Sequence, residues 1–235
     1  MVKLKLPFSF HKSAAPSKIR PIIYHKNLKY PEVDNWQISE FIVKVLVPIV
    51  GWHPYPLSEM QLMVGALCWF QPKYILDWGT HTGIATRIFY ETVKYFNLKT
   101  KVISIDLPEG VEHCEHPHQN YALFVKHIPE ITLLRGDGLN TALAIVSKMK
   151  LGKALFFLDG DHEYESVKRE LNGIHKKVKT PAMLLHDTFF QSGKSGYNTG
   201  PHRAIEEFLA KHKKYVQLKT VLGRPGMDFL YVSKK

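Results

Sequence analysis

The chain has 235 residues, 45% of them hydrophobic, and a formal net charge of +11 at pH 7. This length suits one domain, or one domain with an extension, and the composition supplies a sizeable core. The two cysteines exclude a disulfide framework. No apolar stretch resembles a signal peptide or a membrane span, so we expect a cytoplasmic protein without a membrane partner.

The positive charge is spread along the chain. Lysines gather near the ends of expected helices and at both termini, and cations at helix C-termini are stabilised by the helix dipole. No basic run is interleaved with aromatic residues, as a platform for stacking bases requires. A nucleic-acid-binding module stays as the alternative function. Its affinity for nucleic acid would fall steeply with rising salt concentration.

The first quarter of the chain precedes any regular alternation of strands and helices. Residues 1–35 carry scattered prolines and little periodicity, which indicates an irregular arm. Helical spacing of apolar residues predicts helices over Ser39–Val50 and Met60–Phe70, with Ser58 as N-cap of the second. We therefore divide the chain into an arm and helix at 1–56 and a main domain at 57–235. The arm also suggests a homodimer.

From Lys73 onward, strands and helices alternate regularly. Apolar runs predict parallel strands at 74–77, 101–106, 131–135, 154–159 and 181–186. A helix with Pro201 at its first position follows, and Tyr215–Val221 and Met227–Val232 predict a closing antiparallel pair. The expected fold class is α/β, a doubly wound, mostly parallel seven-stranded sheet with an N-terminal helical extension.

The stretch KYILDWGTHTGIATRIF at 73–89 predicts a strand, a glycine turn and a helix. The turn lets backbone N–H groups approach a ligand, and the helix N-terminus favours an anionic group. The spacing departs from the dinucleotide pattern G-x-G-x-x-G, which argues against a nicotinamide oxidoreductase. The pattern D-x-G-x-x-x-G instead resembles motif I of class I S-adenosylmethionine (SAM) methyltransferases. This resemblance assigns four residues to cofactor binding: Asp77, Gly79, Thr80 and Gly83.

Acidic residues or histidines follow successive predicted strands, and the ends of parallel strands meet at one edge of a sheet. Asp106 suits the two hydroxyl groups of a ribose, because a carboxylate accepts two hydrogen bonds, or it is a turn residue before Pro108. Asp137 suits an adenine amino group, with Gly138 allowing close approach of the ring, or it caps the next helix.

The fourth and fifth strand ends carry the densest polar pattern. LDGDHEY places Asp159 and Asp161 two residues apart, and LLHDT places His186 and Asp187 after the neighbouring strand. Clustered carboxylates repel one another unless a cation neutralises them, and such a set suits a divalent cation. A cation there would lower the pKa of a substrate hydroxyl, with Asp161 or His162 as general base.

The order of these motifs resembles class I SAM-dependent O-methyltransferases. LDGDHEY, LLHDT, GPHRAIEEFL and GRPGMDFLY are similar to the macrocin O-methyltransferase and cephalosporin hydroxylase-like group, over about residues 55–233. The lead-in PLSEMQLMVGALCWFQPKYILD, with Glu59 near its start, resembles that group too. His186 departs from the pattern, because relatives often carry an acidic residue there.

The resemblance implies SAM as cofactor, bound in part by Asp159. It also implies a cation, expected to be Mg²⁺, held by Asp159, His186 and Asp187, with Asp161 as the base. The implied activity is methyl transfer to a hydroxyl of a small molecule such as a sugar, a phenol or a natural product. A metal-independent transferase and a hydrolase-like metal enzyme on the same scaffold stay as alternatives.

Two loops carry further polar residues. Glu112–His118 is rich in histidine but lacks the second ligand pair of a zinc site, so we expect a solvated loop. Phe190–Thr199 is glycine-rich and follows the expected cation site, which suggests a lid over substrate or a mobile loop. Lys194 and Tyr197 are its candidate substrate contacts.

Overall fold

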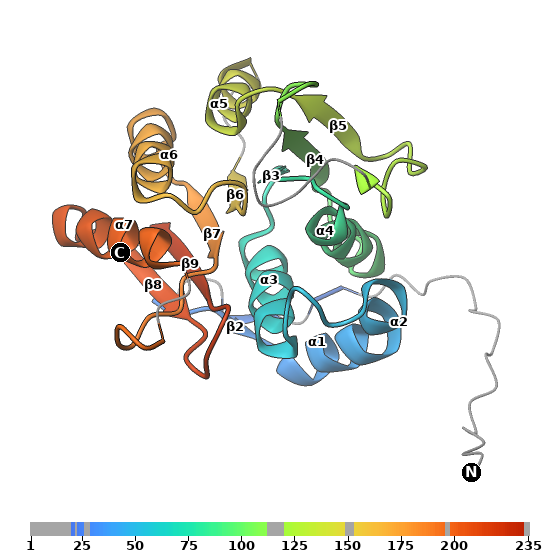
Figure 1. Ribbon diagram of the computed structural model, residues 1–235. Coiled ribbons are helices and arrows are strands. Elements are labelled where there is room, and N and C mark those ends of the chain that lie inside the picture. The colour runs from blue at the N-terminus through green and yellow to red at the C-terminus, as the bar shows by residue number, and fades with distance from the viewer. Residues whose placement is uncertain are drawn as a thin grey trace, which may run out of the picture.

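A seven-stranded sheet forms the centre of the computed structural model, which describes residues 20–21, 23–25, 29–111, 120–148, 153–195 and 198–232 (Figure 1). In chain order its strands are β3 (Tyr74–Trp78), β4 (Lys101–Asp106), β5 (Thr132–Arg135), β6 (Ala154–Leu158), β7 (Ala182–His186), β8 (Tyr215–Lys219) and β9 (Met227–Val232). Across the sheet the order is β5-β4-β3-β6-β7-β9-β8. Pairs from β5 to β7 are parallel, and β9 is antiparallel to both neighbours. The predicted sheet is confirmed.

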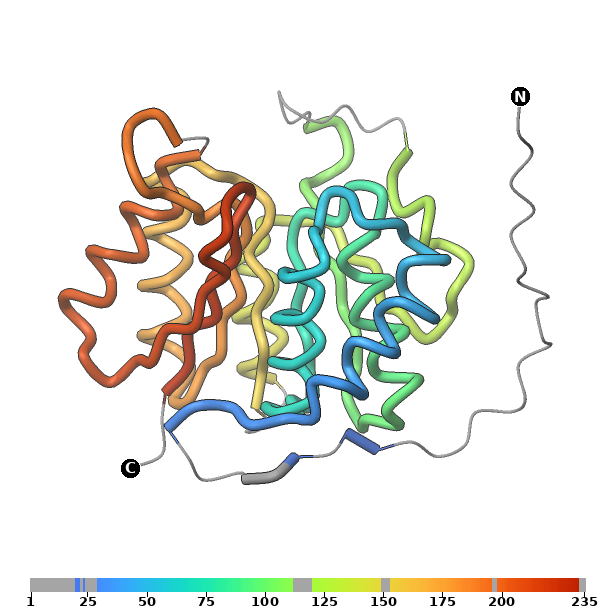
Figure 2. Tube along the Cα trace, turned by 90° about the horizontal axis from the view of Figure 1, so that it is seen from below, coloured from blue at the N-terminus to red at the C-terminus, as the bar shows by residue number. Residues whose placement is uncertain are grey.

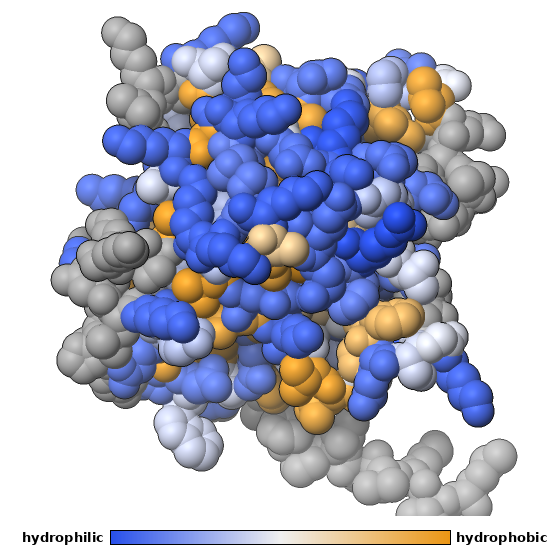
Figure 3. Space-filling view, turned by 90° about the vertical axis from the view of Figure 1, so that its left-hand side faces the viewer, coloured by the Kyte–Doolittle hydropathy of each residue, from blue (hydrophilic) through white to orange (hydrophobic). Residues whose placement is uncertain are grey.

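Helices cover both faces of the sheet (Figures 1 and 2). One face carries α1 (Asn35–Phe41), η1 (Ile42–Leu46), α2 (Val47–Val50), α3 (Leu57–Phe70) and α4 (Ile84–Tyr95), and the other carries α5 (Gly138–Lys148), α6 (Tyr164–Lys177) and α7 (Thr199–Lys211). Successive strand residues alternate between the two cores: Ile75 belongs to the first, and Leu76 to the second. The side of the molecule on which α6 and α7 lie is mostly hydrophilic, as expected for the outer faces of amphipathic helices (Figure 3).

The N-terminal part differs from the sequence expectation in three ways. Residues 1–35 are not wholly irregular, because β1 (Ile23–His25) pairs with β2 (Glu32–Val33). The first helix begins earlier than Ser39, because the Asp34 carboxylate accepts hydrogen bonds from two backbone N–H groups of its first turn. Its middle, η1, is a π-helical segment ahead of Pro48, which has no N–H to donate to the preceding turn.

Two predicted helix starts are also wrong in detail. Pro56 holds the N-cap position of α3, so Ser58 lies inside the helix rather than capping it. Helix α7 begins at Thr199, which makes Pro201 its third residue instead of its first. Ser58 and Pro201 both remain in the first turn of their helices. The backbone N–H groups of a first turn have no partner within the helix, so the missing N–H of Pro201 costs little there.

The N-terminal helices and the main domain share one core. Phe41 and Leu46 are fully buried in the same hydrophobic cluster as α3 and α4, and the boundary at residue 56 stays a prediction. The arm at 1–19, the Glu112–His118 segment and Tyr197 lie outside the described residues. Within the part of the chain that the structure describes, no helix combines the length and apolar character needed to cross a bilayer.

Candidate active site

The glycine turn after β3 brings the ends of three strands together. Gly79 has φ +92°, and its N–H donates to the carbonyl oxygen of Ile105 at 3.0 Å. A Cβ at this position would lie 2.2 Å from the carbonyl oxygen of Asp159. Only glycine permits this approach of the turn to the end of β6, because every other residue would clash there.

A cavity of about 220 Å³ opens at this point. It lies where the strand order reverses between β3 and β6, the place at which open α/β sheets bind ligands. Its lining comes from the ends of β3 to β6 and from one face of α6: Trp78, Gly79, His81, Ile105, Asp106, Leu107, Gly136, Asp137, Gly138, Asp159, Gly160, Asp161, Ser166, Arg169 and Glu170. Five predicted cofactor residues are in this lining, namely Gly79, Asp106, Asp137, Gly138 and Asp159.

The other three predicted cofactor residues are not in the lining. Thr80 is buried with its hydroxyl 2.7 Å from the Ser104 hydroxyl. Asp77 is fully buried and accepts a hydrogen bond from Ser104 at 3.1 Å and another from Thr86. A Cβ at Gly83 would lie 2.6 Å from the Val125 side chain. These residues therefore support the turn from within the protein.

Asp77 also carries an electrostatic cost. Its Oδ1 is buried without a hydrogen-bond partner among the described residues. Burial raises the pKa of this carboxyl to about 7, although the Thr86 hydroxyl and then the Ser104 hydroxyl act in the opposite direction. A buried acceptor without a partner is rare in folded proteins, and strongly shifted pKa values cluster at functional sites.

Asp106 and Asp137 occupy the positions that the sequence predicted, with different surroundings. Asp106 accepts from the backbone N–H groups of His81 at 3.2 Å and Leu107 at 2.9 Å, and it lines the cavity. The Asp137 carboxylate accepts from the N–H of Asn140 at 2.8 Å and from Arg169 at 2.7 Å. Of the two readings that the sequence left open for Asp137, this geometry favours the helix cap.

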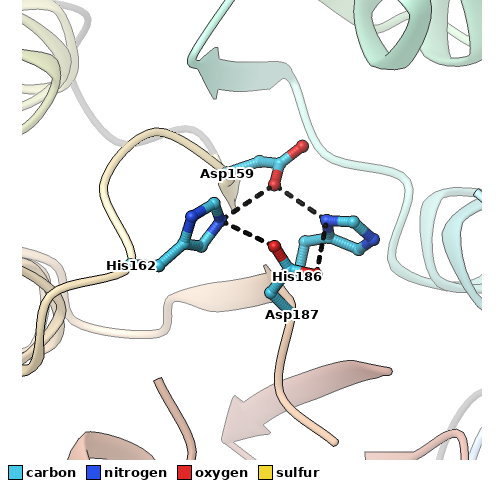
Figure 4. Close-up of side chains that lie close together, drawn as sticks. All are labelled: Asp159, His162, His186 and Asp187. Carbon is cyan, nitrogen blue, oxygen red and sulfur yellow. Dashed lines mark hydrogen bonds and ion pairs between the residues drawn. The ribbon is translucent and has the colours of Figure 1, made fainter. Parts of the chain in front are cut away.

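Beside the cavity lies a cluster of four side chains, Asp159, His162, His186 and Asp187 (Figure 4). One ligand atom from each lies within 4.8 Å of all the others. Nε2 of His162 is 3.5 Å from Oδ1 of Asp159 and 3.2 Å from Oδ2 of Asp187. Nδ1 of His186 is 2.9 Å from Oδ1 of Asp159. The cluster contains the three predicted metal ligands and one of the two predicted bases.

Sequence reasoning named Glu59 only as part of the lead-in segment and gave no role to the groups that hold this cluster in place. Glu59 of α3, only 1% exposed, accepts from Nε2 of His186 at 3.1 Å and from the N–H of Gly226 at 2.7 Å. The Tyr55 hydroxyl donates to Oδ2 of Asp159. An acidic residue within the apolar run of α3 was the available signal, because buried carboxylates are rare unless they are paired.

Asp187 is held in an unusual backbone conformation. Its φ is +56°, in the left-handed region that only a few per cent of non-glycine residues adopt, asparagine, aspartate and histidine most often among them. Asn198, which precedes α7, donates to Oδ2 of Asp187 at 3.0 Å. Such strain is found most often at binding and catalytic sites, where the surrounding structure fixes it.

The charges of the cluster compensate one another. Burial opposes the imidazolium of His186, but the Asp159 carboxylate and its hydrogen bond raise the pKa of His186 well above the usual range. Burial also opposes the imidazolium of His162, but the hydrogen bond to Asp159 raises the pKa of His162 above its usual value. For Asp159 burial would raise the pKa, but the two histidines hold it below the usual range.

Asp161 lies apart from the cluster. Its carboxylate accepts from the N–H of Glu163 at 2.9 Å and from the Ser166 hydroxyl at 2.5 Å, just before and within the first turn of α6. It lines the cavity rather than joining the four clustered side chains. Asp161 therefore orders the start of α6, and His162 is the better placed of the two predicted bases.

The donor set fits a cation. Ligand atoms about 2.1 Å from one metal ion lie about 3.0 Å apart at octahedral angles and about 3.4 Å apart at tetrahedral angles. Nδ1 of His186 lies 2.9 Å from Oδ1 of Asp159, and Nε2 of His162 lies 3.2 and 3.5 Å from the two carboxylates, all close to these values, whereas Nδ1 of His186 lies 3.8 Å from Oδ1 of Asp187. Carboxylate oxygens and imidazole nitrogens are ligand types that divalent metals take.

Comparisons with known proteins identify a domain match within the chain. Residues 76–188, just under half of the chain, match a family model described as a methyltransferase domain. No curated protein matches the chain significantly.

Solved structures with similar folds include three methyltransferases. An O-methyltransferase from Bacillus cereus in complex with S-adenosylhomocysteine (SAH) is 13% identical, with 87% of this chain and 93% of that chain covered and a TM-score of 0.53. The SAH-bound Podospora anserina methyltransferase PaMTH1 is 14% identical, with 88% and 100% covered and a TM-score of 0.53. The O-methyltransferase TomG from Streptomyces achromogenes, in complex with SAM, is 12% identical, with 88% and 93% covered and a TM-score of 0.53.

Identities this low show a shared fold. The chain therefore has the Rossmann-like methyltransferase fold, and its residues 76–188 match a methyltransferase domain.

Proposed function

We propose that this protein transfers the methyl group of SAM to a hydroxyl of a small molecule with the assistance of a divalent cation. One observation carries the proposal: Asp159 lines the cavity after β3 and also belongs to the four-residue cluster. A donor in the cavity and a cation at the cluster would therefore be neighbours. The methyltransferase-domain match and the SAM or SAH named with similar folds support this reading.

The residues of the cavity are suited to hold and orient the cofactor. Asp106 is placed to accept from a ribose diol, because a carboxylate with two backbone N–H donors still has free lone pairs. Gly79 and Gly138 keep side chains out of the cavity where the backbone approaches it. Orienting donor and acceptor in line accounts for a large part of the rate in transfers of this kind.

The cluster divides into ligands and a base. Asp159, His186 and Asp187 would hold the cation, as the sequence predicted. When bound, SAM supplies an electrophilic methyl group, and the cation lowers the pKa of the acceptor hydroxyl. Nε2 of His162, which faces Asp159 and Asp187, would accept the hydroxyl proton. Sugars, phenols and natural products with such a hydroxyl are the acceptor classes that we propose.

A calorimetric titration tests the cofactor, with SAM and SAH added to the full chain in the presence and absence of a divalent cation. Micromolar binding of SAH is expected, and its absence would contradict the proposal. The variant Asp187→Asn tests the role of the cation. Asparagine tolerates the positive φ and has the shape of the aspartate side chain without its charge. The variant should bind SAH normally and transfer no methyl group to any acceptor that the wild type modifies.

A metal-independent transferase on the same fold is the second candidate. It is favoured by the close pairing of the two imidazoles with the two carboxylates, which already balances the charges of the cluster. Prolonged chelation separates the candidates: methyl transfer that survives complete metal removal supports the second, and transfer that is lost and then restored by added cation supports the first.

A further inference from the structure

His186 brings a nitrogen donor to a set of proposed cation ligands that is otherwise made of carboxylates. It ends β7 and is 5% exposed. Its Nδ1 faces the cluster, 2.9 Å from Oδ1 of Asp159 and 3.8 Å from Oδ1 of Asp187 (Figure 4). The other ring nitrogen, Nε2, lies 3.1 Å from Oε2 of Glu59. The ring thus joins the cluster on one side to a buried carboxylate on the other.

Glu59 decides which nitrogen is available to a cation. A carboxylate only accepts hydrogen bonds, so Nε2 carries a proton toward Glu59 and Nδ1 is the atom left for a metal. The second oxygen of Glu59 accepts from the N–H of Gly226 at 2.7 Å, which fixes the carboxylate from the β9 side. A carboxylate behind a histidine in this way sets the orientation of the ring and strengthens it as a ligand.

We infer that this site selects a borderline transition-metal cation, such as Mn²⁺, Fe²⁺, Co²⁺ or Zn²⁺, over Mg²⁺. Nδ1 of His186 is the selecting ligand, and Glu59 is its positioning residue. The inference rests on the proposed function for the position of the cation. Imidazole nitrogen suits transition metals, whereas Mg²⁺ takes oxygen ligands and retains its water. The donor set therefore argues against the Mg²⁺ that the sequence suggested.

A ligand swap provides the test. Glu59→Gln combined with His186→Glu replaces the nitrogen donor by oxygen, while the introduced glutamine can still accept from Gly226 and donate to the new carboxylate. The single variant H186E is unsuitable alone, because it would bury two carboxylates against each other. Full-length wild type and the double variant are titrated calorimetrically with Co²⁺, Mn²⁺ and Mg²⁺.

The measured quantity is the ratio of the Mg²⁺ and Co²⁺ dissociation constants. Oxygen-only sites also favour Co²⁺ to some degree, so the comparison between the two proteins carries the conclusion. We expect the ratio to be at least tenfold higher in the wild type than in the double variant. Equal ratios, or Mg²⁺ bound as tightly as Co²⁺ by the wild type, would overturn the inference.

A second measurement covers the case in which the double variant does not fold. Pulsed EPR of the wild-type Mn²⁺ complex should show coupling to an imidazole nitrogen, and His162→Asn should retain that coupling. Loss of the coupling in H162N, or its absence from the wild type, contradicts the role of His186. SAH titration of the same samples tests the proposed function separately. The metal titrations measure cation preference, and the SAH titration measures cofactor binding.

Discussion

Oε2 of Glu59 lies 3.1 Å from Nε2 of His186, although 127 positions separate the two residues in the chain. The contact joins α3 to the end of β7, and the bond from Gly226 adds the start of β9. The helix that leads into the sheet is thus a structural part of the candidate site. Its carboxylate sits between the His186 ring and a backbone donor, away from water, where hydrogen bonds to charged groups are strongest.

Removal of Glu59 is therefore expected to destabilise the fold. Glu59→Leu leaves the N–H of Gly226 without its acceptor and removes one of the carboxylates that contact His186. We expect a loss of about 3–5 kcal/mol in the free energy of unfolding, measured with urea. Glu59→Gln keeps an acceptor for the Gly226 N–H and places its amide NH₂ toward His186, so it should lose less. Equal losses in the two variants would contradict a specific role of the hydrogen bonds.

Tyr55 is predicted to tune the cluster without supporting the fold. Its ring packs 4.8 Å from the His186 ring and 6.0 Å from the Phe157 ring, centroid to centroid. Tyr55→Phe keeps this packing and removes only the donor to Asp159. Loss of such an outer hydrogen bond typically weakens metal binding about 10- to 100-fold. Calorimetry with Mn²⁺ should show this decrease at an unchanged melting temperature, and unchanged affinity would exclude the role.

His162 and Asp161 should respond differently to neutral substitution. Because His162 is the proposed base, the variant His162→Asn is expected to lower kcat about 100- to 10,000-fold at saturating SAM. Its cation affinity should stay close to that of the wild type. Asp161→Asn should change kcat only a few-fold and lower stability by about 1 kcal/mol, because it weakens the start of α6. A larger kcat effect in D161N than in H162N would reverse the assignment.

Gly79 is predicted to be indispensable to the cavity. Gly79→Ala would place a methyl group 2.2 Å from the carbonyl oxygen of Asp159 at a φ of +92°. The strands must separate to admit it, so SAH binding should be lost in calorimetry. Gly193→Ala is the matched control, since its Cβ would meet nothing within 4 Å. Normal SAH binding in G79A would show that the turn does not shape the cofactor site.

Glu170 is predicted to make stability depend on pH. Burial raises the pKa of this carboxyl from 4.5 to about 8, partly offset by Arg169 and by the hydrogen bond from Trp78. Because the folded protein holds the proton more tightly, this contribution to stability is fully present below about pH 4.5 and is lost as pH rises through about 8.

The matched variant is Glu170→Gln, which retains an acceptor for the Trp78 indole and cannot ionise. We expect the wild type to lose several kcal/mol relative to this variant between pH 5 and pH 9, at about 1.4 kcal/mol for each pK unit. Urea unfolding of both proteins at three pH values measures the difference. If the free energy of unfolding changes with pH in the same way in both proteins, Glu170 ionises in the folded protein without loss of stability.

The local elements and their succession along the chain could be read from the sequence because they follow from short-range chemistry. Alternating apolar runs predict strands wherever they occur, and the carboxyl ends of parallel strands must meet at one edge. Asp159, His186 and Asp187 are predicted to lie together on this basis, and the cluster contains all three. Helix starts were less accurate, because single capping residues such as Asp34 compete with equally plausible neighbours.

The sequence by itself thus determined the sheet, the glycine turn and the strand ends that carry the polar side chains. Only the tertiary structure decided which side chains meet, because α3 and the β8–β9 connection reach the site by packing rather than by pattern. Glu59 gave no periodic signal of its function, and Asp161 was indistinguishable from His162 in the motif LDGDHEY. The direction of a side chain depends on the hydrogen bonds available around it, and those partners come from distant parts of the chain.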